Sequence, residues 1–191
     1  MFGMKMKKED ILKLKAVVLY VLSKCEELDF IHLFKIIYFA ERNQYATYGQ
    51  HLVKDSFCAL EKGPVPSFLY DAVKMVTSGA PSVLPYIDIL ADAMKPGSGE
   101  CYYLVSAKEA PDLEELSEAE VEALDASYSE NIGKDVTTIS RDSHDVAWTS
   151  AWEKGHNSVM DSLMIAKAGG ASDDFLKYIE ESEQLNALIE G

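Results

Sequence analysis

The sequence predicts a mainly α-helical (α+β) fold, a single helical domain with a small β hairpin or sheet. Three observations lead to this prediction. Apolar side chains recur at helical spacing in the N-terminal third, a capping-box pattern opens a helix at Ser117, and two short runs are the best strand candidates. The chain has 191 residues, 48% of them apolar, which is enough to bury a core without a disulfide or a metal. We therefore expect one domain over residues 1–191.

The first two helices are predicted from their apolar stripes. Residues 9–26 place apolar side chains in an i, i+3, i+4 series, with several lysines off that face. Asp29 is a suitable N-cap for a second helix over about residues 30–45, which is apolar on most sides and is therefore expected to be central. Gly49 suits the left-handed position that follows such a helix.

Prolines set the structure of the next segment. Residues 55–60 are expected to be extended, and Pro64 and Pro66 forbid a helix over residues 62–66 and fix an extended turn there. A third helix is expected to follow, over about residues 67–76.

The remaining elements are predicted from turn and cap signals. Residues 83–90 and 101–106 flank the turn-rich segment 95–99, which predicts a hairpin. The capping box opens a helix that runs to about Tyr128. A short helix is expected over residues 136–142, and an amphipathic C-terminal helix over about residues 172–189.

The densest local pattern is a pair of motifs in the first half of the chain. Lys35-Ile36-Ile37-Tyr38-Phe39-Ala40 is followed by Ala59-Leu60-Glu61-Lys62-Gly63-Pro64-Val65-Pro66 and then by Tyr70. On physical grounds this is an architectural corner, because the glycine permits a close backbone approach and the prolines fix the angle at which the next helix starts.

These motifs also resemble a known family. Lys35-x-x-Tyr38-Phe39-Ala40, Gly49 and Ala59-x-x-x-Gly63-Pro64-Val65-Pro66 look like the Panacea domain of the SocA-like antitoxins, which are often phage-associated, and Ser143-His144-Asp145-Val146-Ala147-Trp148 is similar to the family's Ser-His…Trp element. The resemblance is dense over residues 11–75 and returns at 143–148, although many members have Trp where this chain has Leu60. The motif residues, with a structural or partner-binding role implied, are Lys35, Tyr38, Gly63, Pro64, Val65, Pro66, Tyr70, Ser143, His144 and Trp148.

The resemblance implies an antitoxin that neutralises a toxin encoded by an adjacent gene through direct protein–protein binding, without catalysis or a cofactor. Two other functions stay open. One member of the family also delivers its toxin to a protease, so the first alternative is a proteolytic adaptor that presents a client protein to a protease complex. The second alternative is a hydrolase or metal-dependent enzyme that uses His144.

The enzymatic alternatives have little support in the sequence. Ser143-His144-Asp145 contains the residue types of a catalytic triad, but consecutive residues project in different directions and cannot form a relay among themselves. The four histidines are scattered without metal-ligand spacing. The three cysteines, Cys25, Cys58 and Cys101, form no C-x-x-C pair, and we expect buried thiols.

Charge is distributed unevenly. The net charge is −14; residues 1–62 hold 10 basic and 8 acidic side chains, which leaves 8 basic and 24 acidic ones for residues 63–191. So acidic a surface argues against nucleic-acid binding, and we interpret Lys5, Lys7 and Lys8 as a solvated terminus. The charge predicts a basic toxin as partner; alternatively, it only keeps the protein soluble.

Location and tertiary contacts complete the predictions. The sequence has neither an apolar run of membrane-spanning length nor the h-region of a signal peptide, so we expect a cytoplasmic protein that does not enter a membrane. The two motif regions are about 80 residues apart along the chain. We expect His144 and Trp148 to fold back onto the corner made by Tyr38 and Gly63-Pro64-Val65.

Overall fold

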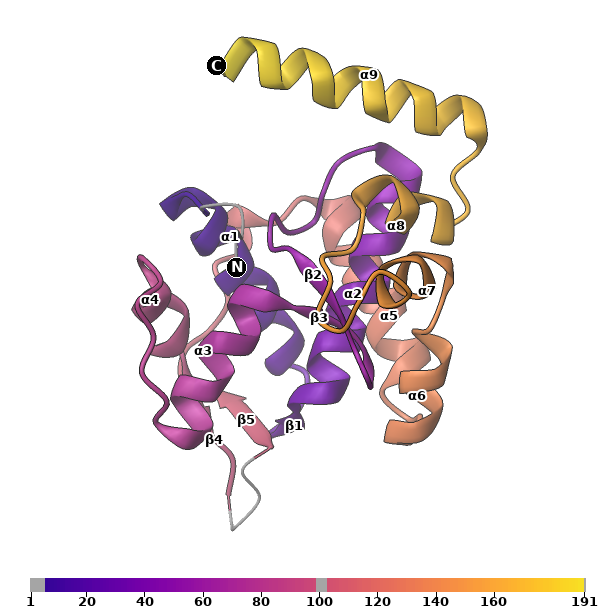
Figure 1. The fold of residues 1–191 in the computed structure, drawn as a ribbon. Helices are drawn as coiled ribbons and strands as arrows, with labels where there is room; N and C mark the ends of the chain where they lie inside the picture. The colour runs from indigo at the N-terminus through magenta and orange to yellow at the C-terminus, as the bar shows by residue number, and fades with distance from the viewer. Residues whose placement is uncertain (1–5, 99–102, 191) are drawn as a thin grey trace.

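Helix α2 (Phe30–Tyr48) forms the centre of the molecule and is buried on most sides (Figure 1). The computed structural model describes residues 6–98 and 103–190. The helix begins where the Asp29 side chain accepts a hydrogen bond from the backbone amide of His32. It ends at Gly49, whose φ of +65° is a left-handed conformation that glycine adopts without strain. Both boundary signals are the predicted ones, and the helix runs about one turn past Tyr45.

Shorter elements surround α2. In chain order they are α1 (Lys8–Leu22), β1 (Leu28–Asp29), β2 (Phe57–Leu60), β3 (Gly63–Pro66), α3 (Ser67–Ser78), α4 (Ile87–Ala91), β4 (Met94–Pro96), β5 (Leu104–Ala107), the 3₁₀ turn η1 (Leu113–Glu115), α5 (Glu118–Asn131), α6 (Val136–Asp142), α7 (Val146–Trp152), α8 (Ser162–Ala168) and α9 (Asp173–Glu190). The protein is mainly α-helical with a small antiparallel sheet, as predicted. Helix α1 ends four residues earlier than its apolar series suggested.

The capping box at Ser117 forms as predicted. The backbone amide of Glu120 donates to Ser117 Oγ, and the Glu120 carboxylate accepts from the Ser117 amide at 2.7 Å. The same carboxylate lies 2.6 Å from Lys13 Nζ on α1. The start of α5 is therefore fixed by its own cap and by an ion pair to the first helix.

Strands β1, β5 and β4 form a three-stranded antiparallel sheet with β5 between the other two. Strand β5 falls largely within predicted strand 101–106, of which residues 101 and 102 lie outside the described residues, but its hairpin partner β4 overlaps the segment predicted as the turn. The strand predicted at residues 83–90 is wrong. Ile87 and Leu90 instead occupy the buried face of helix α4, which packs against α1 and α3, so tertiary contacts override the strand-like composition.

Strands β2 and β3 form a separate hairpin, in which Phe57 pairs with Pro66 and Leu60 with Gly63. The segment predicted as an extended turn is therefore a strand. Among the described strands β3 pairs with β2 alone, so its two prolines can lack backbone donors without breaking a second ladder. On its other side, β2 is covered by the segment around Val159, through an isolated bridge to Cys58.

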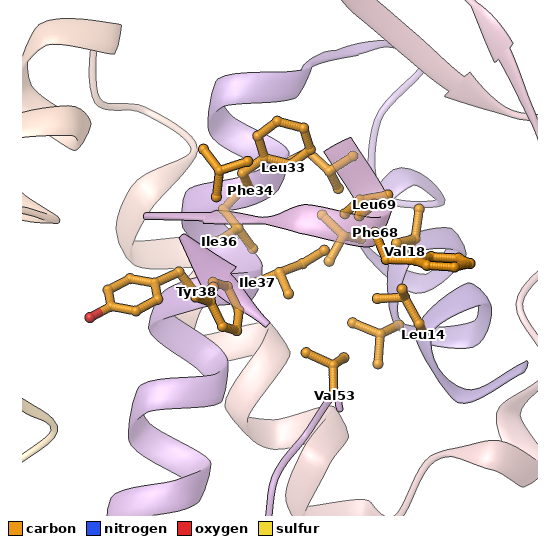
Figure 2. Close-up of a cluster of buried hydrophobic side chains, with 14 of the residues drawn as sticks. Leu14, Val18, Leu33, Phe34, Ile36, Ile37, Tyr38, Val53, Phe68 and Leu69 are labelled. Carbon is orange, nitrogen blue, oxygen red and sulfur yellow. The ribbon is translucent and has the colours of Figure 1, made fainter. Parts of the chain in front are cut away.

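The main core lies where α1, α2 and α3 meet under this hairpin (Figure 2). Leu14 and Val18 of α1 face Leu33 and Ile37 of α2, and all four are fully buried. The side chains that complete the labelled cluster are Phe34, Ile36, Tyr38, Val53, Phe68 and Leu69.

Helix α9 matches the predicted C-terminal amphipathic helix and runs along the outside of the molecule (Figure 1). Its Ile179 joins Tyr45 and Ala166 in a second, small cluster of buried side chains. In the described part of the chain, every helix is too short or too polar to cross a lipid bilayer.

Candidate functional site

The motif residues meet at the tip of the β2–β3 hairpin. Gly63 has a φ of +99°, and a Cβ atom placed on it would overlap Ser143 Oγ and lie 2.9 Å from Lys35 Cε. The missing side chain therefore lets α2 and the segment after α6 approach the hairpin backbone. We call this meeting point the hairpin junction; it consists of Lys35, Tyr38, Leu60, Gly63, Ser143, His144, Asp145 and Trp148.

Lys35 is the buried cation of the hairpin junction. Its side chain projects from the middle of α2, is only 1% exposed, and donates a hydrogen bond from Nζ to the carbonyl oxygen of Pro64 at 2.7 Å. Burial lowers the pKa of Lys35 to about 7, because removing an ammonium group from water disfavours the charged form. The side chain thus joins α2 to β3 while carrying only a partial charge at neutral pH.

Asp145 joins α2 to α7. Its Oδ2 atom accepts hydrogen bonds from the Tyr38 hydroxyl at 2.7 Å and from Arg42 at 3.1 Å. Its Oδ1 atom accepts from the backbone amides of Ala147 and Trp148, so the same carboxylate is the N-cap of α7. Burial, and then the nearby charge of Asp145, raise the pKa of Tyr38. Figure 2 shows the Tyr38 hydroxyl pointing away from the side chains of α1.

Trp148 and His144 cover the hairpin tip from the other side. Trp148 Nε1 donates to the carbonyl oxygen of Leu60 at 2.9 Å, and the His144 ring stacks on the indole with ring centroids 3.8 Å apart. Burial, and then the positive charge of Lys35, lower the pKa of His144. His144 and Trp148 thus fold back onto the hairpin, where Trp148 contacts Leu60, while their neighbours Asp145 and Ser143 contact Tyr38 and approach Gly63, respectively.

The other motif residues line the hairpin and the start of α3. Pro64, Val65 and Pro66 are buried in β3, as is Gly63. Tyr70 lies on α3, where its ring meets Phe34 edge-on at a centroid distance of 6.0 Å. Tyr70 thus lies beside the hairpin junction, in contact with Phe34 of α2, and is not part of the junction.

The hairpin junction does not assemble a serine–histidine–carboxylate relay. Ser143 is fully buried, and its Oγ donates to the carbonyl oxygen of Ser140 at 2.7 Å. Both oxygens of Asp145 are used by α2 and by the cap of α7, so this carboxylate orients Tyr38 rather than an imidazole. The geometry is that of a brace between the hairpin, α2 and α7.

Histidines and cysteines elsewhere also have structural surroundings. His32 bonds through its two ring nitrogens to Asp29 and to the Lys134 carbonyl oxygen. Burial raises the pKa of the Cys25 and Cys58 thiols, while Cys101 lies outside the described residues. Within residues 6–98 and 103–190, no three His, Cys, Asp or Glu side chains converge closely enough to hold a metal ion.

Sequence reasoning missed Arg42, and it named Asp145 within the Ser143–Trp148 motif without finding its role as the N-cap of α7 and the partner of Tyr38. Arg42 follows Tyr38 by one helical turn, and i, i+4 spacing on α2 would have placed both side chains on one face. Asp145 precedes the apolar run Val146-Ala147-Trp148, which is the position of an N-cap, so a search for helix starts would have found the capping role. The acceptor role of the Leu60 carbonyl has no sequence signal, because any residue could supply it.

Comparison with known proteins agrees with the motif assignment. A family model described as "Antitoxin SocA-like, Panacea domain" matches residues 33–149, more than half of the chain. The matched range contains the whole hairpin junction and leaves out α1, α8 and α9. No curated protein and no solved structure matches the chain.

Proposed function

Because the chain belongs to the family of SocA-like antitoxins with a Panacea domain, we propose that it neutralises a protein toxin, encoded by an adjacent gene, through direct binding. In this proposal the hairpin junction holds the fold together, no cofactor or chemical step takes part, and the toxin docks on the outer surface. The single observation that carries the proposal is the family match over the residues that form the hairpin junction.

The inward orientation of the motif residues supports a structural role for them. Lys35 and Ser143 are almost completely buried, and their polar atoms bond to backbone carbonyls inside the protein. Side chains used in this way offer little to an external partner. The toxin-binding surface is therefore to be sought outside the hairpin junction.

Helix α9 has the properties of such a surface. Its Ile179 and Phe175 pack toward Gly49, and Tyr45 donates a hydrogen bond to Glu183, so one face holds the helix on the body. Leu185 and Leu188 are 58% and 80% exposed. Exposed apolar groups of this size on an amphipathic helix are typical of a protein contact.

Charge completes the description of the partner. Residues 173–190 contain six acidic side chains and one basic side chain. A second copy of α9 would bring like charges together, whereas a basic segment with apolar side chains would satisfy both features of this helix. In our proposal the basic toxin therefore contacts α9.

Co-expression tests the proposed function. The neighbouring gene is expressed alone and together with this protein, and we expect growth arrest that co-expression relieves. Arrest that persists with the wild-type protein, or a neighbour that is harmless alone, contradicts the antitoxin proposal.

A pair of surface variants tests the docking face. We expect Leu185→Asp combined with Leu188→Asp to abolish relief, because a carboxylate would be buried in the contact. Val83→Asp is the matched control: Val83 is 98% exposed in the loop before α4 and should keep full relief. Circular dichroism checks that both variants remain folded. Full relief by the α9 variant would exclude α9 as the contact.

A further inference from the structure

A cavity of about 630 Å³ lies beside the hairpin junction, between the first half of α2, the tip of the β2–β3 hairpin and the start of α3. Its volume is in the range of small-molecule sites. The lining is mainly aromatic and aliphatic, with Phe30, Ile31, Phe34, Val65 and Tyr70 among its apolar residues. The charged residues of the lining are Asp29, Lys35, Glu61 and Lys62. Phe30, Phe34 and Tyr70 form a continuous aromatic wall, with centroid distances of 5.6 and 6.0 Å between neighbouring rings.

The environment of Lys35 leaves its charge uncompensated. Among the described residues, the neutral carbonyl of Pro64 is the acceptor for its Nζ atom. Two carboxylates line the cavity: Asp29 is occupied by the amide and ring of His32, and Glu61 is exposed to solvent. A buried ammonium group with donors to spare and no paired carboxylate is stabilised by an anion that enters from the cavity.

We propose that this cavity binds a small amphiphilic carboxylate, such as a medium-chain fatty acid, with the carboxylate hydrogen-bonded to Lys35 Nζ and the hydrocarbon chain against the aromatic wall of Phe30, Phe34 and Tyr70. A carboxylate supplies the missing acceptor for Lys35, and a hydrocarbon chain matches the apolar lining. This site is independent of the antitoxin proposal, since it needs neither a toxin nor α9.

The charged groups around Lys35 set the pH dependence of this site. Asp29 at the end of β1 and Glu61 in the turn after β2 contribute negative charge, and Lys62 in the same turn and His144 between α6 and α7 contribute basic groups. Lys35 itself loses its proton above about pH 7 in the free protein. A bound carboxylate prefers the protonated lysine, so its affinity should fall as the pH rises above that value.

Calorimetric titration with octanoate and with octan-1-ol tests the proposal. Both probes have the same chain, and only octanoate has the anionic group. We expect Lys35→Met to weaken octanoate at least about tenfold and to change octanol less than about twofold, as for loss of one charge-assisted hydrogen bond. Ile31→Trp fills the cavity and should weaken both probes. Lys177→Met removes an exposed lysine on α9, outside the cavity lining, and should change neither.

The wild-type protein provides a second test that needs no variant. Between pH 6 and about 8.5 we expect octanoate affinity to fall while octanol affinity stays constant. The proposal is overturned if octanoate shows no saturable binding, or if its preference over octanol survives both Lys35→Met and the rise in pH. It is also overturned if octanoate fails to bind and Ile31→Trp abolishes binding of the toxin, since the cavity would then belong to the protein partner.

Discussion

The indole nitrogen of Trp148 donates a hydrogen bond to the carbonyl oxygen of Leu60 at 2.9 Å, across 88 residues of chain. This bond ends at the last residue of β2, where the chain turns toward β3. The His144 ring stacked on the indole covers the same place. Helix α7 is thus attached to the hairpin by a polar contact at its tip.

The first prediction concerns this attachment. Trp148→Phe keeps an aromatic ring against His144 but removes the indole hydrogen bond to the Leu60 carbonyl, and we expect the free energy of unfolding to fall by about 1–2 kcal/mol. Trp148→Ala also removes the ring, and we expect the free energy of unfolding to fall by about 3 kcal/mol. This is the lower end of the range for truncating a large aromatic residue, because the Trp148 side chain is only partly buried. Urea unfolding measures both.

The control for this prediction is on the same helix. Val146 is exposed on α7, so Val146→Ala should change the unfolding free energy by less than about 0.5 kcal/mol. Equal effects of Val146→Ala and Trp148→Phe would mean that the indole hydrogen bond contributes nothing measurable.

A second prediction follows from the close approach at Gly63. Gly63→Ala forces an unfavourable φ and a clash with Ser143 Oγ, and we expect a loss of about 3 kcal/mol or more. Gly79→Ala is the matched control, because Gly79 also has positive φ but has open space around it, so only the backbone term of about 1 kcal/mol applies.

The clash can be separated from the backbone strain by a double-mutant cycle. Ser143→Ala removes the overlapping oxygen and should by itself reduce stability by about 1 kcal/mol, since it also deletes the hydrogen bond to Ser140. In the double variant we expect a loss smaller than the sum of the two single losses by at least about 1 kcal/mol. Strict additivity would show that the Ser143 oxygen does not restrict this position.

The sequence predicted the elements whose signals are local. The cap at Asp29, the glycine at 49 and the capping box at Ser117 each depend on residues within one turn, and each forms as expected. The helix over residues 136–142 has the predicted bounds. These signals work because the backbone groups that they satisfy belong to the same element.

The failures have non-local causes. Residues 83–90 have strand-like composition, but residues 83–86 are loop and turn, and helix α4 starts at Ile87, where it packs against α1 and α3. The depth of Lys35 was equally hidden, because a lysine on a mostly apolar helix is ordinarily expected to reach solvent. The position of the hairpin over α2 determines its burial, and no pattern within α2 encodes that position.

The third prediction uses the buried position of Lys35. Its pKa is lowered to about 7 in the folded protein, against an ordinary value of 10.5, so the unfolded state binds more protons between these values. The contribution of Lys35 to the free energy of unfolding is therefore most favourable above the pKa that this lysine has in the unfolded chain. It decreases as the pH falls toward 7, because protonation stabilises the unfolded state. We expect the unfolding free energy of the wild type, relative to Lys35→Met, to rise by about 1 kcal/mol per pH unit from pH 7 to about 9.

Urea unfolding of both proteins at several pH values measures this difference, and other groups that titrate in the range cancel because both proteins contain them. At neutral pH we expect Lys35→Met to be at least as stable as the wild type. The variant loses one hydrogen bond, but it no longer has to bury an amine that water would otherwise solvate. A difference that stays constant with pH would show that Lys35 titrates normally and is hydrated in solution.

The fourth prediction concerns how the proposed toxin reaches the protein. If the toxin is basic, the acidic residues after position 62 accelerate encounter over distances comparable to the Debye length, while the apolar contacts at α9 hold the complex once formed. Raising NaCl from about 50 to about 500 mM should then slow association about tenfold or more and change dissociation less than about threefold, which surface plasmon resonance separates. Neutralising Glu180 and Glu181 to Gln should reduce the salt dependence of association without altering the dissociation rate. Dissolved salt always screens long-range attraction between opposite charges. An association rate that does not respond to salt would therefore assign the acidic surface to solubility alone and would leave the antitoxin role intact.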